Sequence, residues 1–198
     1  MHALLLMMLA ASPTANDTSI DFDTRVIPVL TKAGCNTGAC HGAAAGRGEF
    51  RLSLYGSDPE FDHRSIAFEI EGRRVNLANP DDSLLLLKAT ESINHGGGPR
   101  LELEGSGTEV IRQWIHEGAV RASSASLNRF AVQPGSTVLS GVNQTVDLRA
   151  TAEFSDGEVE DVTKWTVFKP EDTASVEVDA ETGTATVIRR GRHIVVAR

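Results

Sequence analysis

The stretch "KAGCNTGACHGAAAG" (residues 32–46) contains both cysteines of the chain, Cys35 and Cys40, and His41 directly follows the second. Two cysteines beside a histidine can form a covalent haem site, a disulfide or part of a metal centre. In c-type haem attachment, two thiols bond to the porphyrin vinyl groups and the adjacent histidine ligates the iron. The usual spacer between the cysteines has two residues and this one has four, so the spacing alone leaves haem and disulfide open. Zinc is the weakest of the three, because the sequence has no second cysteine pair.

The residues around this stretch predict short helices joined by glycine-rich loops. The clearest helix signal has a capping box between Ser106 and Glu109, followed by apolar residues at helical spacing. A short strand is predicted for "FRLSLYG" (residues 50–56). Three helices are predicted: one capped by Asp23 or Thr24 and stopped by Gly34, one in "NPDDSLLLLKAT" (residues 79–90) and one in "SGTEVIRQWIHEGA" (residues 106–119).

The composition and the N-terminus indicate an exported protein. The chain has 198 residues and a formal net charge of −8, which argues against a nucleic-acid surface. "MHALLLMMLAASPTAND" (residues 1–17) reads as a secretory signal, so we expect residues 1–15 to be a signal peptide and the protein to reach the periplasm or cell envelope. The apolar run is too short to span a bilayer, and no other segment of the sequence approaches the necessary length.

The histidines supply the candidates for a second axial ligand. All three methionines lie inside the predicted signal, so His/Met ligation is excluded in the mature chain. His95 opens "HGGGPR", where three glycines let the backbone pass close to a flat group. We therefore predict His95 as the distal ligand and expect His63 and His116 on the surface. An "HGGG" loop also forms the oxyanion hole of some hydrolases, but the G-x-S-x-G nucleophile motif that this requires is absent from the sequence.

A set of motifs in the first half resembles a known family. The motifs are "FDTRVIPVLTKAGCNTGACHG", "FRLSLYGSDPEFD", "GRRVNLANPDDSLLLLKAT", "HGGGPRL" and "IRQWIHEGA", and they span residues 21–120. In this order they resemble the cytochrome-c-like domain at the start of large planctomycete envelope proteins. The resemblance implies one covalently bound haem c, with Cys35 and Cys40 as thioether positions and His41 as the proximal ligand. The expanded spacer departs from the common C-x-x-C-H pattern.

The second half alternates apolar and polar residues, which is typical of strands. "FAVQPGSTVLSGVNQTVDLRATAEFSDGEVEDVTKWTVF" (residues 130–168) and "TASVEVDAETGTATVIRRGRHIVVAR" (residues 173–198) resemble the bacterial Ig-like group 2 (BIG2) domain. The resemblance implies an all-β sandwich over residues 127–198 that lacks its usual last strand. Such domains act as spacers or adhesion modules, so it also implies contact with the cell envelope or a polysaccharide. Trp165 is expected in the core of this sandwich.

The predicted fold class is therefore two domains, a mainly α cytochrome-c-like domain followed by an all-β Ig-like sandwich. The leading function is an exported c-type cytochrome module that transfers electrons to a redox partner, which the sequence does not name. Cys35, Cys40, His41 and His95 would bind the cofactor, and the two histidines would ligate its iron. No catalytic acid, base or nucleophile set is visible, so no enzyme class is assigned. The alternative is a non-haem envelope binding module with a Cys35–Cys40 disulfide.

Overall fold

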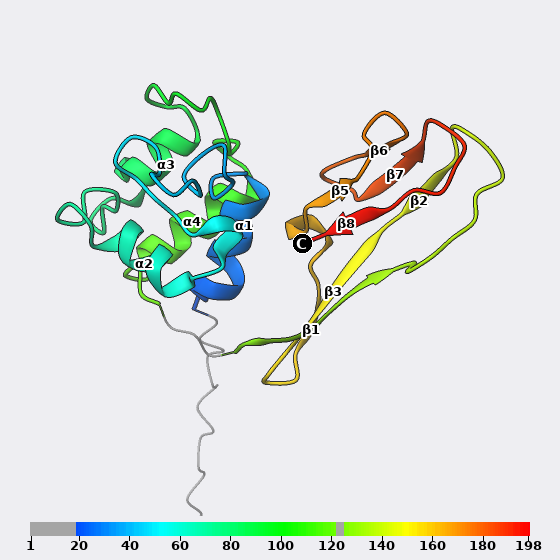
Figure 1. Cartoon of the computed structure of the whole chain (residues 1–198). Helices are drawn as coiled ribbons and strands as arrows, with labels where there is room; N and C mark the ends of the chain where they lie inside the picture. Colours follow the sequence, from blue (N-terminus) through cyan, green and yellow to red (C-terminus); the bar gives the residue numbers. More distant parts are fainter. Residues whose placement is uncertain (1–18, 122–124) are drawn as a thin grey trace, which may run out of the picture.

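The computed structural model of the chain describes residues 19–121 and 125–198. Helices occupy the first part and strands the second (Figure 1). The α-helices are α1 (Ile27–Lys32), α2 (Pro59–Ala67), α3 (Leu84–Ala89) and α4 (Ser106–His116). The strands are β1 (Leu127–Gln133), β2 (Thr145–Asp147), β3 (Arg149–Phe154), β4 (Val159–Asp161), β5 (Phe168–Pro170), β6 (Val176–Val178), β7 (Thr184–Val187) and β8 (Val195–Ala197).

The predicted fold class is wrong. Across the described ranges eight strands paired in sheets outnumber the four short α-helices, and helix of all kinds makes up 26 %. The longest helix, α4, has 11 residues, and α1 and α3 have six each. Irregular loops separate the helices because the chain repeatedly turns through the left-handed region, as at Gly34, Tyr55 and Gly72. Helices this short do not build a cytochrome c helical domain.

The strands do not form the expected two-sheet sandwich either. They pair antiparallel in three small sheets with the strand orders β1-β3-β4, β2-β7-β6 and β5-β8. The sequence pattern of "TVDLRATAEF" predicts one strand, but the chain leaves the ladder at Leu148. As a result β2 pairs with β7, while β3 pairs with β1 and β4. The alternating segment of residues 145–154 therefore contributes strands to two different sheets.

Local signals in the first half also differ from the prediction. The first helical segment is a five-residue π-helix (Phe22–Val26) capped by Asp21, which accepts a hydrogen bond from the Thr24 amide at 2.9 Å. The second predicted helix is interrupted at Ser83, whose extended backbone separates a 3-10 turn (Pro80–Asp82) from α3. Residues 50–56 form no strand, and α4 begins without a side-chain cap. Because Asp side chains can accept hydrogen bonds from nearby backbone amides, the first cap moves from the expected Asp23 or Thr24 to Asp21.

The helix α2 was not predicted from the sequence, although its start is conventional. Asp58 caps it by accepting a hydrogen bond from the Phe61 amide at 3.0 Å, and Pro59 occupies its first position. Asp62 within α2 is fully buried and accepts hydrogen bonds from the backbone amide and the hydroxyl of Ser53. This carboxylate fixes the loop that follows the cysteine motif.

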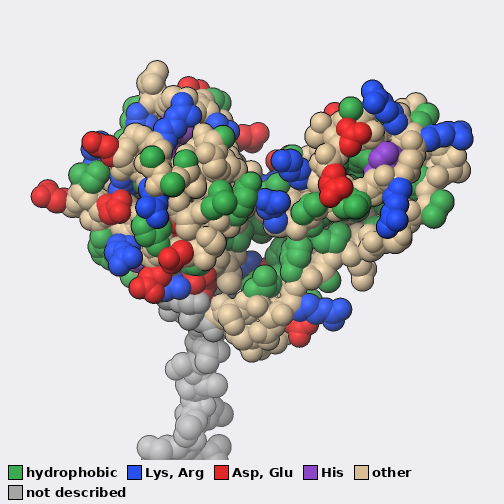
Figure 2. Space-filling view, in the orientation of Figure 1, with side chains coloured by type: hydrophobic (Ala, Val, Ile, Leu, Met, Phe, Trp, Pro, Cys, Tyr) green, Lys and Arg blue, Asp and Glu red, His purple; other side chains and the backbone are tan. Residues whose placement is uncertain are grey.

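The two parts of the chain pack against each other. The core of the first part consists of apolar residues from all four helices and the loop before α2, centred on Phe22, Leu30, Leu52 and Trp114. Trp165, expected in a sandwich core, instead packs against this core. The Lys32 ammonium donates to the Thr166 carbonyl at 2.6 Å. In Figure 1 the strand β8 runs toward the helical part. Figure 2 shows basic and acidic side chains interspersed over the visible face of that part.

Candidate functional site

A cavity of about 500 Å³ lies in the first part of the chain, between the cysteine loop, α3 and the glycine turn after His95. This volume falls within the range of about 300–1,000 Å³ that is typical of small-molecule and cofactor sites. Three of the four predicted site residues line the cavity: Cys35, His41 and His95. Apolar side chains form much of the remaining wall, namely Leu30, Phe50, Ile70, Leu84, Leu85 and Ala89.

The rings of His41 and His95 are nearly parallel, at 12°, with centroids 6.2 Å apart. Rings stacked in direct contact would be about 3.5–4 Å apart, so room for an atom remains between them. Two metal–nitrogen bonds of about 2 Å, plus about 1 Å from each nitrogen to its ring centre, add up to about 6 Å. The centroid separation therefore equals that of two imidazoles on one metal ion, but each lone pair lies in its ring plane, so these stacked rings must rotate before both Nε2 atoms point at the metal.

The hydrogen bonds of both rings determine which nitrogen is left for a ligand. Nδ1 of His41 lies 3.0 Å from the Phe50 carbonyl oxygen, and Nδ1 of His95 lies 2.9 Å from that of Gly98. A carbonyl oxygen can only accept, so each Nδ1 carries a proton and donates it. In the neutral ring the lone pair then resides on Nε2, and metal-binding histidines are commonly oriented by such a bond.

The environment of His41 favours its neutral form. Burial of the ring lowers its pKa below the ordinary value, and the nearby His95 lowers it further. The hydrogen bond to the Phe50 carbonyl opposes this shift but does not reverse it. A neutral imidazole is the form that binds metal ions, so His41 does not have to lose a proton near neutral pH to act as a ligand.

The two cysteines are free thiols in different surroundings. Cys35 lines the cavity, and burial raises the pKa of its thiol to about 11, with a further contribution from Cys40. Cys40 is 8 % exposed, is not part of the cavity lining, and accepts a hydrogen bond at its Sγ from Nη2 of Arg100, 3.6 Å away. Cys35 therefore stays protonated at neutral pH, which slows its oxidation because the thiolate is the reactive form.

Four cationic residues in the lining were not predicted from the sequence: Arg47, Arg73, Arg74 and Lys88. The lining includes no Asp or Glu, although the chain as a whole carries a net charge of −8. Arg74 is 5 % exposed and donates to the Ser65 and Glu49 carbonyls, so it holds the wall together. The only hint in the sequence is the pair of arginines in "GRRV", which local patterns cannot assign to a cavity.

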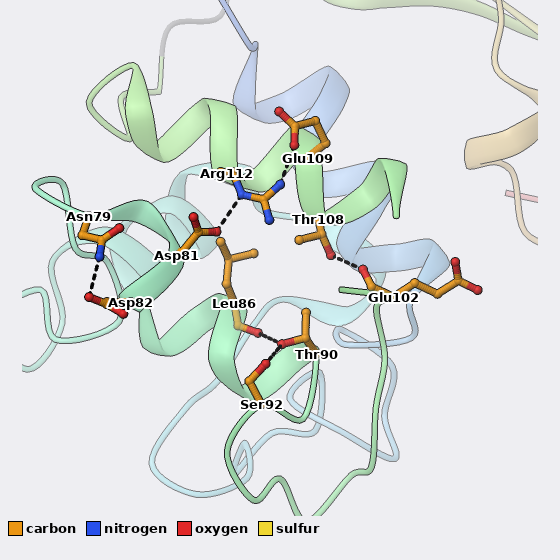
Figure 3. A network of polar contacts seen from close by, with 10 residues as sticks. All are labelled: Asn79, Asp81, Asp82, Leu86, Thr90, Ser92, Glu102, Thr108, Glu109 and Arg112. Carbon is orange, nitrogen blue, oxygen red and sulfur yellow. Dashed lines mark hydrogen bonds and ion pairs between the residues drawn. The ribbon is translucent and has the colours of Figure 1, made fainter. Parts of the chain in front are cut away.

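A polar network behind α3 holds this wall in place (Figure 3). Arg112 of α4 donates to Asp81, at 2.7 Å, and to Glu109. The Thr108 hydroxyl donates to the Glu102 carbonyl, and the Thr90 hydroxyl donates to the carbonyl of Leu86, one turn earlier. The Arg112–Asp81 bond connects α4 to the turn before α3, and α3 contributes Leu84, Leu85 and Lys88 to the cavity.

The other candidate histidines lie away from the cavity. Nε2 of His63 donates to the Ala119 carbonyl at 2.8 Å, and the ring packs edge-on against Phe22 and Trp114, so His63 is half-buried rather than on the surface. His116 is exposed at the end of α4. Among the described residues, no group of three or more His, Cys, Asp or Glu side chains is placed to hold a metal ion.

The predicted signal peptide, residues 1–15, lies outside the described residues. None of the helices within residues 19–121 and 125–198 is long and apolar enough to cross a membrane. No protein-family model matches the chain, and a search of curated proteins found no match.

Proposed function

We propose that this chain is an exported electron-transfer protein that binds one haem c covalently in the cavity. Cys35 and Cys40 would form the thioether bonds, and His41 and His95 would ligate the iron from opposite sides. The observation that carries the proposal is the pair of parallel imidazoles, 6.2 Å apart, in a cavity lined by Cys35. The resemblance of residues 21–120 to haem-binding sequences supports the same cofactor, although the fold is not that of cytochrome c.

The chemistry of the lining fits such a group. An apolar wall suits the flat face of a porphyrin, and both histidines have Nδ1 bound to a carbonyl, which leaves Nε2 for the metal. Arg47, Arg73 and Lys88 would balance the two carboxylates of a haem, which is why an acidic protein would collect cations here. A porphyrin supplies four nitrogen ligands of its own, so two histidines complete the coordination of its iron.

The cysteines would attach the cofactor without any oxidant. Each thiol would add to one vinyl group of the porphyrin. The S–H bond and the C=C π bond break, sulfur bonds to one vinyl carbon, and the hydrogen bonds to the other. Cys35 already lies in the lining, while Cys40 must turn its sulfur from Arg100 toward the cavity. Because His41 follows Cys40, attachment there also fixes the proximal ligand.

Ligation of the iron by two histidines would suit the site to electron transfer. The bound iron supplies a reversible one-electron couple. With both axial positions filled by His41 and His95, no position remains for a substrate, which favours electron transfer over chemistry at the metal. Histidine in place of methionine gives a lower reduction potential.

Production of the full chain in a host with cytochrome c maturation tests the proposal. We expect a pyridine haemochrome spectrum with one haem per chain, a mass increase of one haem, and a low-spin spectrum. His95→Ala should convert the spectrum to high-spin while the covalent haem remains. His116→Ala is the matched control, because His116 is exposed on α4, and it should stay low-spin.

Two results would contradict the proposal. The first is protein without a haem band whose mass shows an oxidised Cys35–Cys40 pair, which would support the disulfide-containing binding module instead. The second is a His95→Ala variant whose spectrum is as low-spin as that of the parent, which would exclude His95 as an iron ligand.

A further inference from the structure

Two arginines connect the loop of His41 to the turn of His95, one in each direction. Arg47, which follows His41 in the chain, donates from Nη2 to the carbonyl of Gly96 at 3.1 Å. Arg100, which follows His95, donates from Nη2 to Sγ of Cys40 at 3.6 Å. Gly96 and Cys40 are the direct neighbours of His95 and His41. An arginine from each loop therefore donates a hydrogen bond to the residue next to the histidine of the other loop.

Arg100 is anchored so that its guanidinium reaches both loops. Its backbone amide donates to the carbonyl of Ala89, at the end of α3, at 2.7 Å. A Cβ placed on Gly97 would lie 3.5 Å from Nε and from Nη2 of Arg100, and one placed on Gly34 would lie 4.0 Å from Nη1. The guanidinium thus lies between the glycine turn and the start of the cysteine loop.

Apart from the Lys88 ammonium of α3, which donates to the Asn94 carbonyl directly before His95, the turn has few links to the rest of the chain. Within the turn, the Gly98 amide donates to the His95 carbonyl at 2.8 Å, and the His95 ring donates back to the Gly98 carbonyl. These bonds close the turn on itself but do not fix its distance from His41. Its three glycines have no side chains to pack, and a Cβ at Gly98 would find no atom within 4 Å. Links from outside the turn must therefore set its position.

We propose that Arg47 and Arg100 are positioning residues that together set the separation of His41 and His95. The inference rests on the proposed function only for its consequence, the coordination of one iron by both rings. We call these two arginines the clamp. The clamp fixes the position of the glycine turn before any ligand binds, so the separation of the His41 and His95 rings does not have to form on binding. Such preorganisation increases affinity because less ordering is needed when the ligand binds.

Hydrogen exchange in the haem-free full chain tests the clamp without the cofactor. The loss of one such hydrogen bond should speed the exchange of the Gly98 amide about fivefold. We expect this in both Arg47→Ala and Arg100→Ala, and Arg100→Ala should also speed exchange around Cys40. Arg64→Ala removes the same charge from an exposed position on α2 and should leave both segments unchanged. Arg100→Lys, which keeps the charge but loses the fork of donors, should fall between Arg100→Ala and the parent.

The haem-loaded protein provides a second readout, the spin state. Arg100→Ala keeps the attachment residues and removes none of the cations of the cavity lining, so its haem content should equal that of the parent. Arg47→Ala also removes a proposed partner of the haem carboxylates, so its spectrum is compared per bound haem. The spectra of both variants should contain a high-spin fraction that grows on warming, and the double variant should show the largest fraction. Unchanged exchange of residues 95–98 in both variants would overturn the clamp, and so would spectra as low-spin as the parent's. If the parent binds no haem, the proposed function fails, and hydrogen exchange still decides about the clamp.

Discussion

Gly97→Ala is the smallest change that should displace His95. A Cβ at residue 97 would lie 3.0 Å from Cε1 of the His95 ring. Ordinary carbon–carbon contacts are about 3.5–4.0 Å, so one of the two groups must move by roughly 0.5 Å. Gly97 does not have a positive φ, so alanine is compatible with the backbone and the only strain is this contact. The ring is the part that yields, because one hydrogen bond to Gly98 holds it.

The displacement is large for a metal ligand. Metal–ligand distances are fixed to about 0.2 Å, so a ring moved by several tenths of an ångström no longer fits the gap between His41 and the iron. Changes of this kind beside a ligand typically reduce metal affinity by about 10–100-fold. We therefore expect covalently loaded Gly97→Ala to show a mixed low- and high-spin spectrum at 25 °C, with haem content unchanged.

Gly98→Ala is the matched control. Gly98 has φ +70°, so alanine there introduces about 1–2 kcal/mol of backbone strain, but its Cβ would meet no atom within 4 Å. This variant should melt earlier than the parent and remain low-spin. The reasoning fails if Gly97→Ala is as low-spin as the parent, or if Gly98→Ala loses the low-spin spectrum to the same extent.

Three further predictions concern stability and thiol chemistry. The hydrogen bond from Arg25 lowers the pKa of the Glu160 carboxyl. The pair therefore stabilises the folded state fully above the ordinary Glu pKa of about 4.3, and this stabilisation is lost as the pH falls through the lower pKa of the folded state. Glu160→Gln should reduce the free energy of unfolding in urea by about 1 kcal/mol at pH 7, and an equal reduction in strong acid would contradict this cause. Asp62→Ala leaves the half-buried Ser53 amide and hydroxyl without their acceptor and should reduce the free energy of unfolding by about 2 kcal/mol. Asp62→Asn should lose less, and equal losses would refute the assignment. Because burial raises the pKa of Cys35 to about 11, iodoacetamide should label it in the haem-free chain at pH 8 about 100-fold more slowly than an ordinary thiol, as followed by peptide mass; ordinary labelling kinetics would show that the thiol is not buried.

Local sequence signals predicted individual elements better than the fold class. The helix in residues 106–119 is present as α4, since apolar residues at helical spacing act within one element. Its expected cap is absent, because Glu109 pairs with Arg112 rather than with the first turn. The strand pattern of residues 145–154 was read correctly as β, but local patterns could not assign β2 to β7 or β3 to β1, because those partners lie far along the chain.

The sequence by itself determined the chemistry available at the site: two thiols next to His41, and His95 before three glycines. Their roles stay predictions, but these residue types could be recognised without a fold. Only the tertiary structure decided that the two imidazoles face one cavity at 6.2 Å, that cations line it, and that Arg47 and Arg100 connect the two loops. The physical reason is that these relations join residues far apart in the chain, and their distances depend on how loops without regular structure pack against α3.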